Sequence, residues 1–392
     1  MVGSRINKLK VTDSPPSPNK YTYWLALSRA PKLSNVRLRK LLSELPNPQS
    51  IFNADPARLM ALGLSDETRQ YINAPDWSVI EKDMGWMQQP SHHLLTLQDS
   101  GYPPRLLEIT DPPPLLFVRG DPRILTYPQI AIVGSRNPTP TGQETAFAFA
   151  KELARLGFVI TSGLATGIDG AAHRGAIAGG GRTIAVVGTG LDRVYPARHR
   201  ELGLDVVKNG TCISEFPLGS PPLAAHFPQR NRIISGLSLG VLVVEATTHS
   251  GSLITARLAA EQGREVFAIP GSIHNPLSRG CHMLLRQGAK LVESASDILE
   301  EIGPQDMAFS SSEASAVEPG ADTARDFQLD AEYKLLLDNI GFEPTLIDVL
   351  VDRTGLTVGV ISSMLLTLEL DGYVASAPGG RYLRTRDQAS KV

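Results

Sequence analysis

The sequence predicts an α/β protein whose central domain is a doubly wound parallel sheet, with one small domain before it and another after it. Short apolar runs at 130–133, 158–161 and 183–187 each lead into Gly, Ser or Thr. Buried parallel strands have this pattern when their carboxyl ends approach a ligand. Segments with helical spacing separate the runs, as expected for right-handed crossovers between parallel strands.

Size, charge and cysteine content limit the class of protein. A chain of 392 residues exceeds one ordinary core, so we expect two or three domains. The net charge is −2, so nucleic acid could be held only at a local basic patch. Cys212 and Cys281 have no Cys or His cluster nearby, which predicts buried free thiols in a reducing compartment rather than a disulfide or a metal site.

The sequence also bears on location. No apolar run is long enough to span a membrane, and the first residues lack the apolar core of a signal peptide. We therefore expect a soluble cytoplasmic protein with no membrane partner.

The N-terminal part predicts a tail and a small helical domain. Residues 1–20 place basic residues among Ser and Pro, with too little apolar content to fold. Residues 21–75 contain short helical segments joined by tight turns, as in SAM-like and helix-hairpin-helix modules that hold DNA or protein. A plain helical cap on the next domain fits the pattern equally well. Predicted strands at 93–97 and 115–118 then extend the central sheet without adding chemistry.

The central domain is predicted to span residues 76–303. Beyond the three runs described above, strands are predicted at 211–214, 241–244 and 265–268, with helices between them. Gly157 follows one of these helices where a C-cap residue belongs. Ligands of such sheets bind at the carboxyl ends of the strands, so we expect the site in the loops that follow them.

The C-terminal part predicts a linker and a winged-helix domain. Residues 304–327 are rich in Ser, Ala and Glu, as in flexible acidic linkers. Residues 328–386 then have the pattern of three helices and a hairpin. The third helix, 357–370, contains no Lys or Arg, although phosphate contacts normally supply most DNA affinity. A protein contact or dimer support is therefore favoured over DNA reading for this helix.

Two candidate anion sites follow the first two core strands. Gly134 opens a turn, Ser135 can donate a hydrogen bond, and the guanidinium of Arg136 matches phosphate oxygens. Ser162 and Gly163 precede a helix whose N-terminus favours an anion. A third candidate, described next, follows a later strand.

Ser250, Gly251 and Ser252 follow the strand at 241–244 and begin another helix, which adds hydroxyl and free amide groups. Separate anion sites along one edge of a sheet suit a nucleotide and a polyphosphate chain equally well.

Asp169 and His173 could belong to the second site or could be structural. An isolated Asp/His pair more often caps a helix and packs under a loop than performs catalysis. The sequence shows no nucleophile with a positioned base, so binding is favoured over catalysis.

The segment 227–236 favours single-stranded nucleic acid as the ligand. It combines Phe227 with Arg230, Asn231 and Arg232 at the start of a helix. An aromatic ring that stacks a base, beside arginines that contact phosphates, holds unstructured strands without reading their sequence.

Ion pairs with Glu245 or Glu215 explain either arginine of this segment, taken alone, equally well. The wider segment 221–290, however, contains seven basic and three acidic residues. This local excess of positive charge favours nucleic acid.

Taken together, motifs over nearly all of residues 95–300 resemble the bacterial DNA-processing protein A family (DprA/Smf). The segments that carry the resemblance are Gly134-Ser-Arg136, Ser162-Gly-Leu-Ala165, Gly167-Ile-Asp169, Ala172-His173, Gly188-Thr-Gly-Leu-Asp192, Tyr195-Pro196, Ser214-Glu-Phe-Pro217, Phe227-Pro228, Arg230-Asn-Arg-Ile-Ile-Ser-Gly236, Val243-Val-Glu-Ala246, Ser250-Gly-Ser252, Thr255-Ala256 and Phe267-Ala-Ile-Pro-Gly271.

The resemblance implies an extended Rossmann-like domain that binds single-stranded DNA, forms a homodimer and loads the RecA recombinase onto incoming strands during natural transformation and recombination. On this interpretation the protein is a non-enzymatic carrier that protects DNA and has no catalytic residue, cofactor or metal of its own. The predicted DNA-binding residues are Gly134, Ser135, Arg136, Ser162, Gly163, Arg198, Phe227, Arg230, Asn231, Arg232, Ser250, Gly251 and Ser252.

Two places depart from the family pattern. Relatives often have a basic residue just after the Tyr-Pro pair and just before the Phe-Pro pair, where this sequence has Ala197 and His226. We expect Arg198 and a protonated His226 to substitute, with affinity that is weaker or depends more on pH. His282 also stands where relatives often have asparagine.

The main alternative is a nucleoside-monophosphate hydrolase of a related Rossmann-like fold. Such hydrolases resemble one another through a Pro-Gly-Gly-x-Gly-Thr loop, whereas Pro378-Gly-Gly380 lies in the predicted C-terminal hairpin. The sequence also lacks the Gly-x-Gly-x-x-Gly of a dinucleotide oxidoreductase at its first core helix and the Gly-x-x-x-x-Gly-Lys-Ser/Thr of a nucleotide-driven motor.

Overall fold

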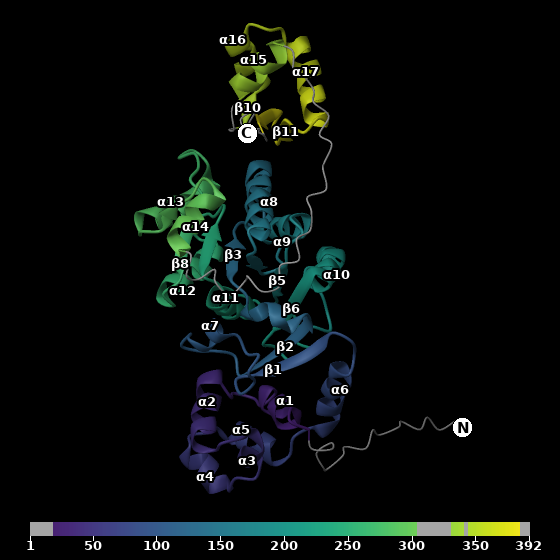
Figure 1. The fold of residues 1–392 in the computed structure, drawn as a ribbon, viewed down its shortest axis with the longest axis vertical. Helices are drawn as coiled ribbons and strands as arrows, with labels where there is room; N and C mark the ends of the chain where they lie inside the picture. Colours follow the sequence, from purple (N-terminus) through teal and green to yellow (C-terminus); the bar gives the residue numbers. More distant parts are fainter. Residues whose placement is uncertain (1–18, 304–330, 341–343, 385–392) are drawn as a thin grey trace, which may run out of the picture.

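The structure, a computed structural model, describes residues 19–303, 331–340 and 344–384 (Figure 1). The predicted linker and almost all of the predicted tail lie outside these residues. Along the described chain, a helical region precedes an α/β region with a large sheet, and a small region of helices and a hairpin follows.

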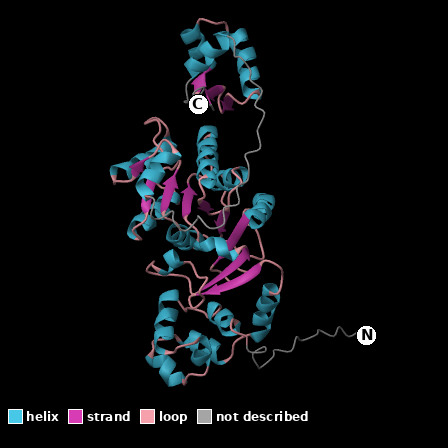
Figure 2. Ribbon diagram, viewed as in Figure 1, coloured by secondary structure: helices cyan, strands magenta, loops and turns pink. Residues whose placement is uncertain are grey.

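Within the described residues, nine strands form one sheet in the order β1-β2-β6-β5-β4-β3-β7-β8-β9. Figure 2 shows the strands in magenta and the helices in cyan. Strands β3 to β9 run parallel, and β1 and β2 are antiparallel to their neighbours. The predicted fold class is confirmed, and β1 and β2 extend the sheet as expected. The strands are β1 (His92–Thr96), β2 (Leu115–Gly120), β3 (Gln129–Val133), β4 (Val159–Ser162), β5 (Thr183–Val186), β6 (Gly210–Ser214), β7 (Gly240–Val243), β8 (Glu265–Ala268) and β9 (Lys290–Leu291).

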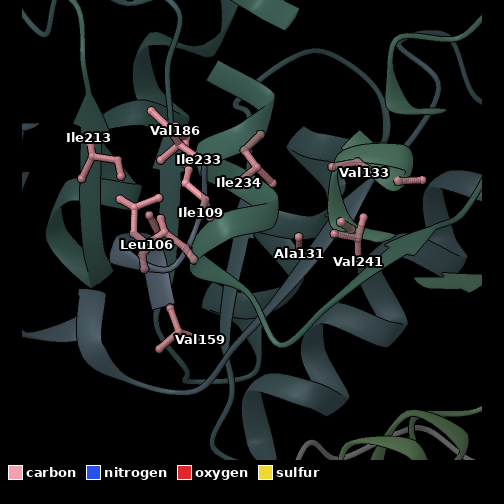
Figure 3. Close-up of a cluster of buried hydrophobic side chains, with 14 of the residues drawn as sticks. Leu106, Ile109, Ala131, Val133, Val159, Val186, Ile213, Ile233, Ile234 and Val241 are labelled. Atoms are coloured by element: carbon pink, nitrogen blue, oxygen red, sulfur yellow. The ribbon is translucent and has the colours of Figure 1, made fainter. Parts of the chain in front are cut away.

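Helices cover both faces of the sheet and explain its uninterrupted apolar runs. On one face, Ala131 and Val133 of β3 pack in a cluster with residues of α11 and α12, including Ile233 and Ile234 (Figure 3). On the other face, neighbouring β3 residues pack in a cluster with α8, α9 and α14. Both faces are buried, so these strands show no polar alternation. The helices are α8 (Pro140–Arg155), α9 (Ile168–Ala178), α10 (Arg200–Asn209), α11 (His226–Leu237), α12 (Ser252–Glu261), α13 (Arg279–Arg286) and α14 (Ala295–Ile302).

The N-terminal helices share part of the core. Trp24 and Trp77 are buried in one cluster with sheet residues such as Phe117 and Ala185. Apolar contacts therefore cross the predicted domain boundary at 75/76. A separate cluster joins the remaining helices. The helices are α1 (Thr22–Ser28), α2 (Asn35–Glu44), α3 (Pro48–Phe52), α4 (Pro56–Ala61), α5 (Asp66–Asn73) and α6 (Trp77–Met87), and a short α7 (Pro104–Leu107) follows β1.

The C-terminal region is a winged-helix domain, as predicted. Its core contains Leu336 from the first helix, Leu350 from the second and Leu365 from the third. The hairpin strands β11 and β12 pair around the predicted turn, and the sequence did not predict the short strand β10. The elements are α15 (Ala331–Ile340), β10 (Thr345–Leu346), α16 (Ile347–Thr354), α17 (Val358–Leu370), β11 (Val374–Ala377) and β12 (Arg381–Arg384).

Within the described residues, no single helix is both long and apolar enough to cross a membrane. Only α16 and α17 taken together pass a test of length and composition, and the chain bends by 110° between them.

Candidate functional site

A hollow of about 290 Å³ lies at the carboxyl ends of β3, β4 and β5. Its lining comes from the loops that follow these strands, the turn before α10 and the start of α11. Three arginines and no Asp or Glu contribute, so the hollow suits an anion. The lining residues are Arg136, Gly163, Ala165, Thr166, Val187, Gly188, Thr189, Tyr195, Pro196, Arg198, Phe227 and Arg230.

An arginine and two aromatic rings form the rim of the hollow. The Cζ atom of Arg136 lies 5.4 Å from the centre of the Phe227 ring. The Tyr195 ring lies 5.7 Å from the same ring, at an angle of 42°. Arg136 and Arg198 are exposed, and neither forms an ion pair within the described residues. A guanidinium with an open fork beside an aromatic face can hold a phosphate while the ring stacks a base.

Backbone contacts fix the turn that presents Arg136. The Ser135 amide donates to the Glu245 carbonyl at 2.7 Å, and the Ser135 carbonyl accepts from the Ile168 amide at 3.1 Å. A Cβ at Gly134 would collide with Ile168 and with the Glu245 carbonyl. Gly134 and Ser135 therefore position Arg136, and neither belongs to the lining of the hollow.

Arg230 lies in the hollow but is only 4% exposed. Its guanidinium donates to the carbonyl oxygens of Gly163, at 2.7 Å, and Val186, and its Nε donates to Asn231. Burial lowers the pKa of Arg230 to about 10, and the nearby Asp169 carboxylate opposes this effect. Arg230 therefore stays charged at neutral pH and ties the loops after β4 and β5 together.

The Asp169 carboxylate holds the loop after β4 from behind. It accepts hydrogen bonds from the amides of Gly163, at 3.1 Å, and Ala165, at 3.3 Å. Burial raises the pKa of Asp169, while the Arg230 guanidinium and these two amides oppose the rise. The carboxylate thus occupies the place at the α9 N-terminus that the sequence offered to a phosphate.

His173 supports the same loop and is structural. Its Nε2 accepts from the Leu164 amide at 3.3 Å, which leaves Nδ1 to donate to the Thr183 hydroxyl at 2.7 Å. Burial lowers the pKa of His173 to about 3, so the ring is neutral. Leu164 has a φ of 56°, which bulky side chains rarely adopt. The wall of the hollow is therefore held in a strained conformation by the residues behind it.

Thr189 offers an unused polar group inside the hollow. It is 1% exposed, and its Oγ1 atom has no hydrogen-bond partner within the described residues. Buried hydroxyls normally have a partner, so this atom is available to a bound group.

Four of the predicted DNA-binding residues are placed in the lining and remain candidates: Arg136, Arg198, Phe227 and Arg230. Gly163 also lines the hollow, whereas Ser162 does not, and the Ser162 hydroxyl and the Gly163 amide are both bonded within the protein. The Ser162 hydroxyl donates to the Ile132 carbonyl at 2.6 Å, and the Gly163 amide donates to Asp169.

The structure places Arg232 outside the lining of the hollow, and its phosphate contact stays a prediction. Arg232 is 8% exposed and forms an ion pair with the buried carboxylate of Glu215, which is one of the two alternatives weighed from the sequence. It also contacts Asp111, at 3.5 Å. Arg264 and Lys290 of the basic segment also pair with carboxylates outside it, Glu108 and Glu301, so together with Arg232 three of the four excess positive charges are neutralised.

Asn231 and the segment Ser250–Ser252 lie outside the lining of the hollow. Asn231 donates to the Gly251 carbonyl at 3.4 Å, and the hydroxyls of Ser250 and Ser252 bond to each other at 2.7 Å. These residues therefore join the start of α12 to α11, which carries Phe227 and Arg230.

Glu245 closes the position where a Rossmann-like sheet usually binds its ligand. The chain adds strands on one side of β3 up to β6 and then on the other side from β7, so the crevice should lie between β3 and β7. There the Glu245 carboxylate accepts from the amide, at 2.8 Å, and the hydroxyl, at 2.6 Å, of Thr139, the N-cap of α8. The hollow is therefore displaced towards β4 and β5.

His226 does not line the hollow. Its ring stacks on Phe216, with centres 3.9 Å apart, and its Nδ1 lies 3.0 Å from the Gly188 carbonyl. The ring nevertheless supports the start of α11 beside the hollow.

Residue-level reasoning missed Tyr195, Thr166 and the loop Val187–Thr189, all of which line the hollow. The loop could have been predicted from the sequence, because it follows the third core strand and contains Gly-Thr-Gly. Ligands bind at the carboxyl ends of parallel strands, and the same reasoning gave the candidate sites after the first two strands.

Comparisons with known proteins identify the family. The model of the DNA recombination-mediator protein A family matches residues 93–303, and that of the DprA winged helix domain matches residues 320–380. The chain is 44% identical to Protein Smf of Escherichia coli over 343 residues, which cover 85% of this chain and 88% of that protein. It is 41% identical to DNA processing protein DprA of Bacillus subtilis over 253 residues, which cover 64% of this chain and 84% of that one.

Among solved structures, the X-ray structure of DNA processing protein A (DprA) from Streptococcus pneumoniae aligns with a TM-score of 0.64 and 38% identity, covering 73% of this chain and 99% of that one. The sequence match and the shared fold thus agree on one family. The chain therefore belongs to the DNA recombination-mediator protein A family, also called DprA/Smf.

Proposed function

We propose that this chain binds single-stranded DNA in the hollow at the carboxyl ends of β3, β4 and β5 and acts as a recombination mediator. One observation carries the proposal: the rim combines the ring of Phe227 with Arg136 and Arg198, two exposed arginines that have no carboxylate partner among the described residues. The arginines hold phosphates, and the ring stacks a base. The S. pneumoniae structure aligned above is that of a DNA processing protein, and this supports the assignment.

The same geometry favours an unpaired strand over duplex. A base can stack on Phe227 only after it leaves its partner, because paired bases are buried in the duplex stack. In addition, the hollow of about 290 Å³ is closed on one side by the loop that Asp169 and His173 hold. A space of this size accepts a nucleotide but not a double helix.

Hydrolysis of nucleoside monophosphates is the less favoured function. Such a reaction needs a carboxylate or another base that faces the bound nucleotide. The lining contributes no Asp or Glu, and the carboxylate of Asp169 behind it is bonded to two amides. We therefore propose a binding protein that catalyses no reaction.

The wider role follows from the family. A recombination mediator delivers single strands to a recombinase, so we propose that this chain protects incoming strands and loads RecA onto them in the cytoplasm during natural transformation and recombination. The test is filament assembly by RecA on a single strand coated with a single-strand-binding protein. Addition of this chain should speed assembly, and unchanged assembly would contradict loading.

We also propose that the chain forms a homodimer. Strand β9 ends the sheet, and Leu291 on that strand is 51% exposed. An open sheet edge with an exposed apolar side chain is a common place for association. Light scattering should give the mass of a dimer, and the mass of one chain would contradict the proposal.

An equilibrium titration tests strand binding. Labelled single-stranded and duplex oligonucleotides of the same length are titrated with the protein at low and at physiological salt. We expect tighter binding of the single strand, with an affinity that falls steeply as salt rises because bound phosphates release counterions. Equal binding of the two forms, insensitive to salt, would contradict the proposal. Release of free base from nucleoside monophosphates, measured in parallel, would favour the hydrolase.

A further inference from the structure

A second concave surface lies beside the hollow, between α8 and α9. It is a groove of about 590 Å³, and its lining includes Pro138 and Pro140 before and at the start of α8, Phe147 on α8, and Arg174 on α9. None of its lining residues belongs to the hollow. It is therefore a separate site that the proposed strand pocket does not use.

Two segments connect the groove with the hollow. The chain that leaves Arg136 at the rim of the hollow reaches Pro138 in the groove two residues later. On the other side, the loop 163–166 that lines the hollow leads into α9, which carries Arg174. The Thr166 hydroxyl donates to the Arg136 carbonyl at 3.0 Å and joins these two segments. A DNA strand that leaves the hollow past Arg136 would therefore enter the groove directly.

The side chains of the groove suit one more nucleotide. Arg174 is exposed and forms no ion pair within the described residues, so its guanidinium is available to a phosphate. Phe147 is partly exposed and lies between apolar neighbours, as in platforms that stack a base. Glu144 also lines the groove, so the net charge is near zero, and we expect a single phosphate contact at Arg174 rather than a tract of them.

We propose that this groove is a second contact site for the same single strand, which receives the nucleotides that extend beyond the hollow. The inference rests on the proposed function of the hollow. It predicts that Arg174 and Phe147 contribute to the binding of long strands only, because a short strand is fully accommodated by the hollow.

The test compares two oligothymidylates, one of about 6 and one of about 20 nucleotides, in titrations with the full chain. Arg174→Ala should weaken binding of the long strand about three- to tenfold and leave the short strand unchanged. It should also lower the salt dependence of the logarithm of the binding constant by about 0.7, the value for one phosphate on a single strand. Arg174→Lys should restore much of the affinity. Phe147→Leu should lower the affinity for the long oligothymidylate about fivefold, because the base loses its stacking contact.

The matched control is Arg155→Ala, which removes an exposed arginine from the last turn of α8, outside the groove. It should change neither affinity. Arg136→Ala should weaken both strands, because Arg136 belongs to the hollow. Phe147 also packs against the core, so its substitution can change stability as well as binding. Arg174→Ala is therefore the deciding variant.

If Arg174→Ala binds both oligonucleotides as tightly as the wild type while Arg136→Ala binds them more weakly, the groove is not a contact site, although the proposal for the hollow stands. If Arg174→Ala lowers the affinity for the short and the long oligonucleotide equally, the proposal for the groove is contradicted as well, because Arg174 would then act at the hollow. No effect of Arg136→Ala on either strand would overturn the hollow itself, and with it the groove.

Discussion

The hollow of the central domain lies at the strand ends where α/β sheets bind ligands, and helix α17 lies where winged-helix domains commonly read DNA, yet their side chains differ. The hollow has Arg136 and Arg198 exposed at or near an aromatic rim. Helix α17 exposes Leu366, at 61%, and Leu370, at 81%, and contains no Lys or Arg. Position in a fold alone therefore does not predict a strand-binding surface; exposed positive charge beside an aromatic ring is the feature that favours one.

A second contrast lies inside the hollow, between arginines that hold the structure and arginines that are free for a ligand. Arg230 is buried among carbonyl oxygens and faces Asp169, whereas the Arg136 guanidinium is exposed, lies beside the Phe227 ring and forms no ion pair among the described residues. Substitution of Arg230 should therefore lower mainly the stability of the protein, and substitution of Arg136 mainly its affinity for single-stranded DNA.

The largest expected effect is that of Arg230→Ala on stability. The change leaves the buried Asp169 carboxylate without its countercharge and frees the loops after β4 and β5, so the free energy of unfolding should fall by about 3–5 kcal/mol. Urea denaturation measures this loss. Arg257→Ala on the exposed side of α12 is the control and should change stability little. Normal stability of Arg230→Ala with lost strand binding would instead make Arg230 a direct ligand contact.

The next effect is that of Arg136→Ala on affinity. Loss of a charged hydrogen-bond donor to phosphate should weaken single-strand binding by about 1.5–3 kcal/mol, which is tenfold or more, without loss of stability. Arg198→Ala should act in the same direction. Fluorescence anisotropy measures the affinity. Wild-type affinity in both variants would place the strand elsewhere on the molecule.

The dependence of stability on pH probes the buried support of the hollow. His173 has a pKa of about 3 in the folded protein against an ordinary 6.5, so the unfolded chain binds an extra proton between these values. Its contribution to the free energy of unfolding is therefore complete above pH 6.5 and falls as pH decreases, by about 2 kcal/mol at pH 5.

Denaturation of wild-type protein and of His173→Gln at neutral pH and at pH 5 measures this contribution. The variant should lose less stability on acidification, because glutamine takes up no proton. The same pH dependence in both proteins would mean that His173 is charged or solvated in the folded state.

The smallest expected effect concerns α17. Removal of residues 328–392 should change single-strand affinity by less than about 0.5 kcal/mol, because α17 offers no positive charge to phosphate. Anisotropy with the truncated chain tests this. A large loss of affinity would show that the winged-helix domain binds DNA through residues outside α17 and would remove the contrast drawn above.

The sequence predicted the core strands because their apolar runs are buried on both faces and end in small residues. The sequence also predicted the sheet extension by β1 and β2. The faces of α15, α16 and α17 were predicted from the helical spacing of their apolar residues. The sequence could not predict β9, because a strand of two residues shows no period.

The site was predicted only in part, because sequence does not show which way a charged side chain points. Arg230 and Arg232 lie two positions apart on α11, and both turn inward. The partner of Arg232, Glu215, follows β6, and Asn35 of α2 bonds to that same carboxylate from 180 positions away. Only the folded chain brings these groups together. Arg136 and Phe227 were assigned to one pocket only by the family resemblance, and the structure places the Arg136 guanidinium beside the Phe227 ring.

A crystal structure with bound oligothymidylate tests the central claim most directly. We predict phosphates at Arg136 and Arg198 and a base on the ring of Phe227, with Arg230 still bonded to the Gly163 carbonyl and no nucleotide on α17. An empty hollow with the strand bound elsewhere, on α17 or along the N-terminal helices, would contradict the account.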